Sequence, residues 1–557
     1  MVVLKGAAPS GERNFYAKDE TLKKILAKRL PEEFFRYADR ELHSFGKLAA
    51  GDIDERARHT DREGAPKLEK YNRLGEDISR VWVNEGYKKT VDETYKTGIV
   101  GYVHKEIPQL GRKGNYVYSF AQGYLLSQSE PGFYCPVTLT MATAYLLNHY
   151  ADGAVKEKFL PHVCATGDTE LFEGATFLTE RQGGSDVGAN VVQALKTDDG
   201  YRLYGEKYFA SNAGMAGVAM VLARMQGAPD GSKGLTLFAV PWKVDGALNG
   251  IKIRRLKDKL GVRAVPSGEV EFDGAQAFVV GDPKSGLKYM MEALNLSRIC
   301  NAVASIGIMK RALDEATEYA ERRNAFGKKL TDFPMVQDSL MKLRAKQEFE
   351  TAAIFDLIDL YDRVTVGNAS PDEQVLNRLL IAVLKKESAE QAIHFSHESI
   401  EMHGGNGYIE DFITPRLLRD AQVLTVWEGT ANILGLELIR LVNKFSAHEL
   451  FIQHIEERLE KLQTTKDVEL VKGKTESLQA ELTAFAEFDA ALQSFDAKGL
   501  MKKMAQLFEN TIALEWAEQH GGIYAPLSEI FTELTWETRT TGGDMKTVKW
   551  FEEVMGR

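Results

Sequence analysis

The stretch Ala175-Thr176-Phe177-Leu178-Thr179 marks the point at which the hydrophobic pattern of this chain changes from a helical period to a period of two. Before it, apolar residues recur at helical spacing, as they do over residues 138–147. After it, short apolar stretches with turn signals every ten or so residues continue to Val280 and predict an antiparallel β barrel or sandwich. Helical spacing returns at Gly286, so the sequence predicts helices on both sides of a middle β domain.

These elements place the chain in the α+β class and divide it into four domains. An N-terminal α-helical domain precedes the antiparallel β domain, a four-helix bundle follows it, and a further helical extension completes the chain. With 557 residues, the chain is too long for a single hydrophobic core. The expected domain boundaries are 1–165, 166–283, 284–445 and 446–557.

Individual elements follow from the same periodicity. Thr197-Asp198-Asp199-Gly200 reads as a hairpin turn, and Ser446 with Glu449 is a possible capping box at the start of the extension. Gly521-Gly522 is expected to close an amphipathic helix near the C-terminus. Strands are expected at 175–179, 191–195, 201–204, 218–222, 235–240, 251–256, 269–272 and 277–280, and long helices from Gly286 and at about 335–361, 372–402 and 432–445.

The composition is that of an ordinary globular protein, with 44% apolar and 27% charged residues. The net charge of −10 argues against a chain that binds nucleic acid strongly. The three cysteines lack CxxC spacing, which fits a reducing compartment and no structural zinc site. The N-terminus has no long apolar segment and no run of about 18 apolar residues occurs, so we expect a cytoplasmic protein without a membrane span.

The tetrapeptide Trp427-Glu428-Gly429-Thr430 places a carboxylate between a large aromatic residue and a glycine. Next to Trp427 and apolar flanks, Glu428 could be desolvated and become a stronger base, while Gly429 lets another group approach the backbone closely. A plainer interpretation is a surface helix that begins with Glu in its first turn. These four residues alone favour the plainer interpretation, so the rest of the chain decides.

Four other stretches suit a bound cofactor. Residues 179–187 combine two glycines with two hydroxyls, which suits phosphate binding, although their spacing matches neither a Walker loop nor a dinucleotide motif. Phe209 and Ser211, at a strand end, could cover a flat ring and hydrogen-bond it. Arg323 suits phosphate, and the three glycines within 404–407 allow close backbone approach. Each stretch alone also fits an ordinary turn, strand end or helix terminus.

Two further patterns have structural explanations that we favour. Cys135 could be a thiol nucleophile, but no local base accompanies it, so we expect a buried structural cysteine. His394-x-x-His397 could be a metal-binding pair, but no third ligand follows at a suitable spacing. The sequence therefore predicts no metal site.

Taken in order, these stretches resemble the acyl-CoA dehydrogenase family, FAD enzymes of fatty-acid and branched-acid breakdown. The shared series is Thr-Glu-x-x-x-Gly-Ser-Asp-Val, aromatic-x-Ser-Asn, Arg-x-x-Phe-Gly, Gly-Gly-Asn-Gly and aromatic-Glu-Gly-Thr, and the resemblance covers about residues 75–445. The sequences at 133–138, 179–187 and 255–261, together with Trp427, resemble the AidB-like branch of the family.

The resemblance implies an acyl-CoA dehydrogenase that gives a trans-2-enoyl-CoA in β-oxidation. Glu428 matches the catalytic base, which takes the α proton while a hydride leaves the β carbon for the flavin. Substrate contacts are implied for Ser185, Trp427 and Glu428. An electron-transfer flavoprotein is the implied acceptor, and the family's usual homotetramer, a dimer of dimers, is the implied assembly. FAD contacts are implied for Thr179, Gly184, Ser185, Phe209, Ser211, Thr430 and Asn432, and contacts with a neighbouring subunit's FAD for Arg323, Phe326, Glu401 and Gly405.

The chain departs from the family pattern at three positions. Many relatives have Gln where this chain has Pro334 and Glu401, which puts FAD contact there in doubt. An Arg common in short- and medium-chain relatives is Gly268 here, so binding of the CoA end is expected to differ.

Two competing functions follow from the same resemblance. One is a DNA-associated flavoprotein of the alkylation response, as in the AidB-like branch; the other is an acyl-CoA oxidase that uses oxygen directly. A DNA-binding role favours a basic C-terminal surface. Residues 441–557 instead contain 13 Lys and Arg against 20 Asp and Glu, a net charge of −7, although Lys502-Lys503 and Lys546 with Lys549 could form a small basic patch.

Overall fold

The computed structural model describes residues 13–198, 200–536 and 543–556. The chain divides into two compact units, and the boundary between them falls inside the long helix α8 (Gly286–Arg322). One unit contains Pro31–Cys300 with the short segment before Asp19, and the other contains Asp19–Leu30 with the chain from Asn301 onward. The four domain boundaries expected from the sequence stay predictions.

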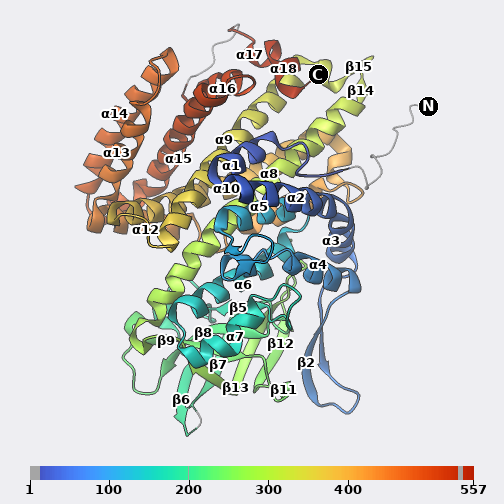
Figure 1. Ribbon diagram of the computed structural model, residues 1–557, viewed down its shortest axis with the longest axis vertical. Helices are drawn as coiled ribbons and strands as arrows, with labels where there is room; N and C mark the ends of the chain where they lie inside the picture. Colours follow the sequence, from blue (N-terminus) through green and yellow to red (C-terminus); the bar gives the residue numbers. More distant parts are fainter. Residues whose placement is uncertain (1–12, 199, 537–542, 557) are drawn as a thin grey trace. The chain divides into compact units, whose positions relative to one another are not determined.

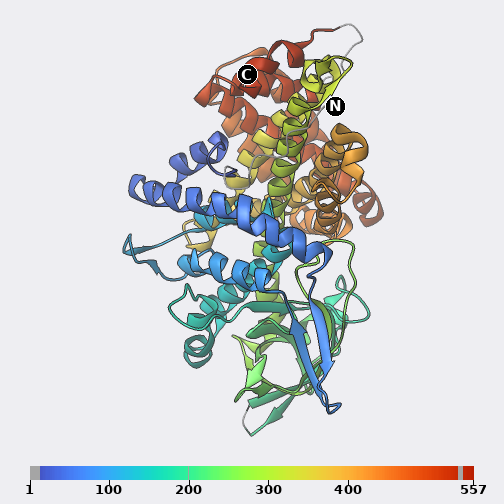
Figure 2. The ribbon, with the colours of Figure 1, turned by 90° about the vertical axis from the view of Figure 1, so that its right-hand side faces the viewer.

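The N-terminal part of the Pro31–Cys300 unit is mainly helical, as predicted. Asn84, Asn115 and Asp152 each cap a helix by accepting a hydrogen bond from the backbone N–H three residues on. A hairpin of β1 (Lys67–Tyr71) and β2 (Asp77–Trp82) interrupts the helices and was not predicted (Figure 2). The helices are α2 (Glu32–Leu48), α3 (Asp54–Arg62), α4 (Glu85–Lys96), α5 (Tyr116–Ser127), α6 (Pro131–Tyr150) and α7 (Gly153–Val163), with a π-helical turn at Ala49–Ile53 and short strands β3 (Glu106–Ile107) and β4 (Arg112–Lys113).

A seven-stranded sheet that closes on itself forms the rest of this unit (Figure 1). The strands β13, β7, β6, β8 and β9 pair in that order and β9 pairs back with β13, while β12 and β5 add to β13 and β8. Most pairs are antiparallel, as predicted, but β5 and β6 both run parallel to β8. The strands are β5 (Gly174–Phe177), β6 (Gln193–Thr197), β7 (Gly200–Ser211), β8 (Val218–Met225), β9 (Leu235–Pro241), β12 (Ile251–Leu256) and β13 (Ser267–Val279), beside the two-residue pair β10 (Lys243–Val244) and β11 (Ala247–Leu248).

Two details of the sheet differ from the expected strands or add to them. The strands predicted at 269–272 and 277–280 are one strand, β13, and the predicted hairpin joins β6 to β7 through a turn whose Asp199 lies outside the described residues. One edge of β8 pairs with β9, and the other edge pairs first with β5 and then with β6. The chain therefore leaves the sheet after Phe177 and returns at Gln193, and this excursion carries the motif at 179–187.

The unit from Asn301 onward contains the predicted helix bundle. Three helices accompany the C-terminal part of α8, namely α9 (Pro334–Thr365), α10 (Pro371–His403) and α12 (Ala431–Phe445), close to the predicted ranges. Ser370 and Glu373 form a capping box at the start of α10. Between α10 and α12, the sequence did not predict the short helix α11 (Thr414–Leu424) or the 3-10 segment η7 (Gly404–Tyr408). A small hairpin, β14 (Asn324–Ala325) and β15 (Lys328–Lys329), follows α8.

The C-terminal helices and α1 (Glu20–Arg29) pack on this bundle within the same unit; Arg29 Nη2, for example, lies 2.8 Å from Asp356 Oδ1 of α9. Gly521, at φ 55°, ends α15 as predicted. The predicted capping box at Ser446 is wrong, because Ser446 adopts a left-handed backbone (φ 48°) and its side chain caps no N–H group. The remaining helices are α13 (Ala447–Leu459), α14 (Lys466–Ala486), α15 (Ala490–His520), α16 (Tyr524–Trp536), α17 (Lys546–Lys549) and α18 (Phe551–Met555).

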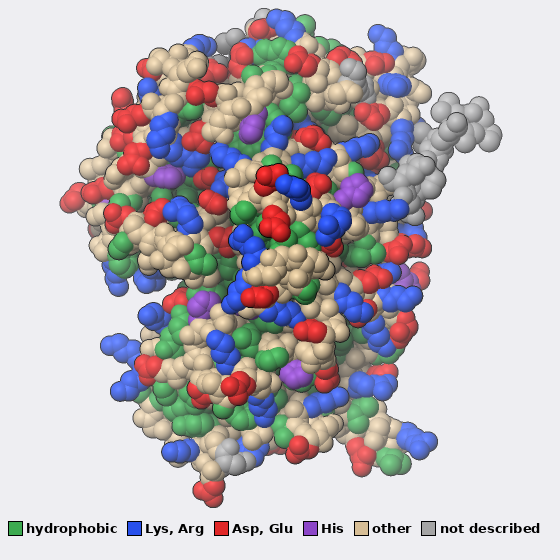
Figure 3. Space-filling model, viewed as in Figure 1, with side chains coloured by type: hydrophobic (Ala, Val, Ile, Leu, Met, Phe, Trp, Pro, Cys, Tyr) green, Lys and Arg blue, Asp and Glu red, His purple; other side chains and the backbone are tan. Residues whose placement is uncertain are grey.

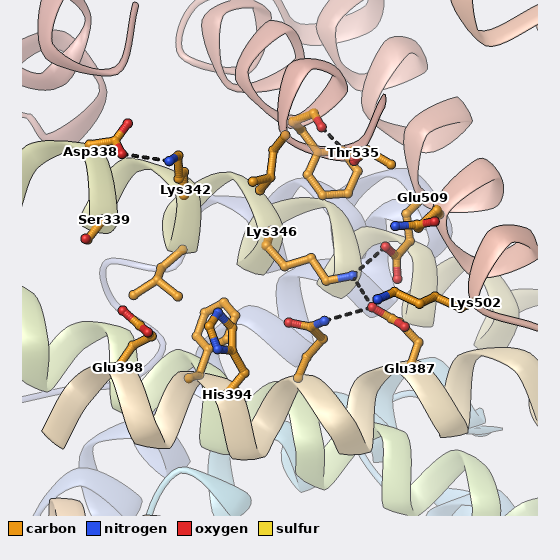
Figure 4. A pocket seen from close by; sticks show the side chains of 16 residues that line it. Asp338, Ser339, Lys342, Lys346, Glu387, His394, Glu398, Lys502, Glu509 and Thr535 are labelled. Carbon is orange, nitrogen blue, oxygen red and sulfur yellow. Dashed lines mark hydrogen bonds and ion pairs between the residues drawn. The ribbon is translucent and has the colours of Figure 1, made fainter. Parts of the chain in front are cut away.

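A buried charge cluster joins α15 to the bundle. Lys346 of α9 points between the carboxylates of Glu387 on α10 and Glu509 on α15 (Figure 4), with its Nζ 2.9 Å from Glu387 and 2.6 Å from Glu509. A third carboxylate, Glu350, lies 3.1 Å from the same Nζ. All four side chains are almost completely buried, so three carboxylates share one ammonium group away from water. An uncompensated buried charge is costly, and protons on some of these carboxylates relieve it.

The carboxylates of the cluster have different pKa values. Burial, partly opposed by Lys346, raises the pKa of Glu509 to about 7, and burial raises the pKa of Glu350 well above its usual range. Burial also acts against ionisation of Glu387, but the ammonium of Lys346 and the amide of Gln391 outweigh it and hold the pKa of Glu387 below its usual range. Glu387 is therefore the ionised partner of Lys346, and the other two carboxylates favour protons.

We expect Glu509→Gln and Glu387→Gln to change stability in opposite directions at pH 8. Glu509 binds its proton more tightly in the folded state than in the unfolded state, so its contribution to stability is lost as pH rises from about 4.5 through about 7. A neutral Gln at 509 removes that loss and should stabilise by about 3 kcal/mol at pH 8, whereas a Gln at 387 removes the ionised partner of Lys346 and should destabilise. Thermal unfolding midpoints between pH 4 and 9 test the pair, and equal effects of both substitutions at pH 8 would contradict it.

Candidate active site

Glu428 lies in the loop between α11 and α12 and not in the first turn of a helix. Its backbone has φ 56° and that of Gly429 has φ 106°. Left-handed backbone is costly for a residue with a side chain and persists only where surrounding structure imposes it. Glu428 and Trp427 are both half-buried, whereas Thr430, the N-cap residue of α12, and Asn432 are exposed. The plainer interpretation, in which Glu428 lies in the first turn of a surface helix, is therefore wrong, because Glu428 precedes α12 and has a left-handed backbone.

Two helices of the bundle hold this loop. Asn301 of α8, itself buried, donates from Nδ2 to Glu428 Oε2 at 2.9 Å and to the carbonyl oxygen of Leu424 at 3.1 Å. Lys385 of α10, also buried, donates from Nζ to the carbonyl oxygen of Gly429 at 2.9 Å. The carboxylate and the backbone next to it are therefore fixed from different helices.

The excursion between β5 and β6 is anchored by a buried ion pair in the other unit. Glu180 and Lys207, whose side chains are 2% and 0% exposed, lie 2.8 Å apart. Glu180 also accepts a 2.7 Å hydrogen bond from the backbone N–H of Val191, and Lys207 donates to the carbonyl oxygen of Leu178 at 3.2 Å. Burial lowers the pKa of Lys207 to about 8, and Glu180 opposes that shift. The pair joins both ends of the excursion to β7.

The residues of this excursion form a polar wall beside a cavity. A Cβ added to Gly184 would lie 2.6 Å from Thr179 Oγ1, so glycine allows this close approach of the backbone to the hydroxyl. Ser185 is exposed and lines a cavity of about 670 Å³ together with Asn190 and Arg224. Arg224 donates to the backbone carbonyl oxygens of Gly188, Asn190, Pro229 and Gly231, which shapes this wall.

The end of β7 carries the predicted ring-contacting residues. Phe209 is 55% exposed, which is unusual for Phe, and Ser211 Oγ lies 3.1 Å from Ser267 Oγ. Lys257 Nζ lies 3.3 Å from the centroid of the Tyr208 ring and 4.9 Å from that of Phe209. An exposed aromatic ring beside a hydroxyl and a cation suits a flat, partly anionic cofactor, so the residues of both stretches in this unit fit FAD.

The structure connects the stretches at 323–330 and 403–408 through one residue of α8. Tyr319 contacts the ring of His403 at a centroid distance of 4.2 Å and accepts a 3.1 Å hydrogen bond from Asn406. Arg323 follows one turn later, and its N–H bonds to the carbonyl oxygen of Tyr319 at 2.9 Å. The four predicted contacts with a neighbouring subunit's FAD are exposed side chains or backbone, and Phe326 is 97% exposed; they are Arg323, Phe326, Glu401 and Gly405.

Sequence reasoning missed the residues that hold these loops. Asn301, Lys385, Lys207 and Arg224 received no role, and Glu180 was quoted without one. One signal was available for Lys207, because an ionisable residue that shares the strand face of the buried Leu203 requires a buried partner. No comparable signal marks Asn301 or Lys385, whose partners are distant in sequence. Cys135 was expected to be buried and is only half-buried. The other two cysteines, Cys164 and Cys300, are buried.

Comparisons with known proteins cover the same regions. The chain matches the acyl-CoA dehydrogenase C-terminal domain over residues 284–443, the acyl-CoA dehydrogenase middle domain over 175–275 and the adaptive response protein AidB N-terminal domain over 7–167. It is 33% identical over 476 residues to acyl-CoA dehydrogenase family member 11 of Caenorhabditis elegans, which covers 83% of this chain and 76% of that protein. The chain belongs to the acyl-CoA dehydrogenase family.

Two further matches refine this assignment. The putative acyl-CoA dehydrogenase AidB of Escherichia coli is 34% identical over 343 residues, which cover 60% of this chain and 61% of that protein. The crystal structure of C. elegans ACDH-11 in complex with C11-CoA has a TM-score of 0.88 and 28% identity, covering 99% of this chain and 96% of that one. The predicted AidB-like branch is confirmed.

Family membership confirms several predictions from the sequence. The protein is an oxidoreductase that acts on CH–CH bonds, and the cofactor of this family is FAD. The fold class is the predicted one, with helical parts on both sides of a β domain. Among the described residues, no helix combines the length and apolar content needed to cross a membrane.

We expect Lys207→Met to weaken FAD retention by releasing the excursion between β5 and β6. The substitution leaves Glu180 buried without its cation, which should destabilise the protein by about 3 kcal/mol. The measured quantities are the FAD content of the purified protein and its thermal unfolding midpoint. Arg181→Ala serves as the control on the same excursion, because the Arg181 side chain is 61% exposed and its partner Glu206 keeps a second cation, Arg254. Equal FAD content in wild type and Lys207→Met would refute the anchoring role.

Proposed function

We propose that this protein dehydrogenates an acyl-CoA thioester between its α and β carbons and gives a trans-2-enoyl-CoA. The supporting observation is the carboxylate of Glu428, half-buried, carried on left-handed backbone and held by an amide of α8. Glu428 takes the proton from the α carbon as general base. FAD, when bound, supplies the acceptor for the hydride that leaves the β carbon. The C. elegans structure with C11-CoA supports an acyl-CoA as the class of substrate.

The other site residues bind and orient the reactants. The backbone N–H of Glu428 holds the thioester oxygen and makes the α proton more acidic. Trp427 supplies apolar surface that excludes water from the base, and Ser185 contacts the substrate as well as the cofactor. With FAD bound, Thr179, Gly184 and Ser185 would lie near the flavin and its pyrophosphate, Phe209 and Ser211 would lie beside its ring system, and Thr430 and Asn432 would contact the flavin.

We propose in addition a homotetramer, built as a dimer of dimers, in which each FAD is held partly by a neighbouring subunit. An aromatic ring as exposed as Phe326 is costly in water and available to another chain. Arg323, Glu401 and Gly405 are also exposed. In this assembly they hold the neighbour's FAD, with Arg323 as the phosphate-binding group.

In the cell, we place the protein in the cytoplasm and its reaction in the β-oxidation of fatty acids. An electron-transfer flavoprotein is the proposed acceptor of the electrons. Direct reoxidation by oxygen, as in an acyl-CoA oxidase, uses the same base and the same flavin, so no residue described above favours it.

A DNA-associated role, as the AidB-like branch suggests, receives less support from the charges. Three of the four lysines of the basic patch that the C-terminal sequence could offer are already paired, since Lys503, Lys546 and Lys549 form ion pairs with Glu481, Glu529 and Asp544. On the face drawn in Figure 3, acidic and basic side chains are interspersed, with no broad basic surface. Binding to the phosphate backbone needs a surplus of positive charge, which the extension lacks.

We expect an anaerobic acyl-CoA panel to bleach the oxidised flavin of the wild type. Glu428→Gln should lower the rate of bleaching by about 10³-fold, because Gln cannot accept the α proton, while FAD content stays unchanged. Stopped-flow absorbance at the flavin band measures the rate. Glu410→Gln, an exposed carboxylate just before α11, is the control and should bleach like the wild type.

A different pair of results would favour the DNA-associated role. In that case no acyl-CoA bleaches the flavin, whereas duplex DNA binds with an affinity that falls steeply with salt. Fluorescence anisotropy with labelled duplex at several salt concentrations provides this measurement.

A further inference from the structure

Asn301 makes its contacts with the base through one amide nitrogen. Both hydrogens of Nδ2 have an acceptor, Glu428 Oε2 at 2.9 Å and the carbonyl oxygen of Leu424 at 3.1 Å. Leu424 is the last residue of α11, so its carbonyl is one of those that a helix end leaves without an intrahelical partner. One side chain therefore closes the end of α11 and binds the carboxylate four residues later.

The orientation of this amide follows from chemistry. If the amide were flipped, its oxygen would face the carbonyl oxygen of Leu424 and the carboxylate oxygen of Glu428. Neither can donate a hydrogen bond while Glu428 is ionised. In the observed orientation, Asn301 Oδ1 is buried and accepts no hydrogen bond from the described residues. The amide is thus held by its two donated bonds, and both point to the loop that carries Glu428.

A neutral donor at this position has a defined effect on a base. Half-burial beside Trp427 disfavours the charged form of a carboxylate, whereas a hydrogen bond to the charged form favours it. Asn301 supplies that bond without adding a charge, and its amide does not itself take up or release a proton. It also restricts the rotation of the Glu428 side chain, whose loop already requires left-handed backbone.

We propose that Asn301 is a positioning residue for Glu428, which keeps the carboxylate ionised and aligned for removal of the α proton. This inference rests on the proposed dehydrogenation. Asn301 touches neither reacting carbon in the proposal and acts through the base. Without its amide, the base would ionise only at higher pH and would sample more orientations.

Lys385 is a charged group that the structure places beside the same loop. Its Nζ binds the carbonyl oxygen of Gly429, the residue after the base, and its positive charge also favours an ionised Glu428. The two effects are separable, because a substitution at Asn301 retains Lys385. A change in the ionisation of Glu428 that appears when Asn301 is replaced and Lys385 is kept therefore measures the effect of the amide.

The test is the pH dependence of flavin reduction by an acyl-CoA in Asn301→Leu and Asn301→Asp, each purified with FAD. Leu keeps the branched shape of Asn without its hydrogen bonds, and Asp keeps its size but places a second carboxylate next to the base. For Asn301→Leu we expect the acidic limb of the rate profile to move up by about one pH unit and the plateau to fall about tenfold. For Asn301→Asp the limb should move further in the same direction, because like charges disfavour ionisation.

Asn249→Leu is the matched control. Asn249 is equally buried, with 5% exposure, and its Nδ2 donates to the carbonyl oxygens of Pro241 at 2.8 Å and Gln276 at 2.9 Å. Loss of this amide should lower the thermal unfolding midpoint and leave the pH profile in place. FAD content and unfolding midpoints of all variants separate instability from a change at the base.

The outcomes distinguish this inference from the function on which it rests. A wild type that reduces its flavin, together with an Asn301→Leu profile that overlays it, overturns the role of Asn301 and leaves the dehydrogenation standing. The same holds if Asn249→Leu shifts the profile as much as Asn301→Leu does. A wild-type flavin that no acyl-CoA reduces overturns both.

Discussion

The backbone of Glu428 is left-handed, a conformation that a residue with a side chain disfavours, and the surrounding helices hold it there. Asn301 of α8 binds the carboxylate and the end of α11, and Lys385 of α10 binds the next carbonyl. These contacts come from two different helices of the bundle, so the loop keeps its conformation only while both helices stay packed in it. The bundle thus provides the rigidity that keeps this strained loop in place.

Charged groups elsewhere in the protein are buried under the same requirement for compensation. Glu180 and Lys207 can both be almost fully buried because each neutralises the other, and both bind backbone groups of the excursion that carries Ser185. The cluster around Lys346 is different, since three carboxylates exceed the charge of one ammonium. There the balance requires protons, so the packing of α15 on the bundle is linked to pH, whereas the anchoring of the excursion rests on a balanced pair.

The elements of the fold were readable from the sequence because periodicity is local. The change of period near Ala175 located the β domain, and the apolar stripes located α9, α10 and α12 within a few residues. The parallel pairing of β5 and β6 with β8 could not be predicted from the sequence. It depends on a long-range arrangement, in which β9 occupies one edge of β8 and leaves the other edge for β5 and β6. Ser446 shows the limit of motif reasoning, because a capping box also needs a backbone conformation that the sequence does not specify.

For the candidate site, residues that would contact ligands could be proposed from the sequence, but the residues that hold the loops carrying them were assigned no role. Glu428, Ser185 and Phe209 belong to short motifs whose residue types suit a reaction or a cofactor. Asn301 lies 127 positions from Glu428 in the sequence. The residues next to Asn301 in the sequence do not distinguish it from a buried Asn that binds only backbone groups, such as Asn249. Asn249 and Asn301 differ in what accepts their hydrogen bonds. A bond to a backbone carbonyl oxygen stabilises the fold, whereas a bond to a carboxylate also lowers the pKa of that carboxylate.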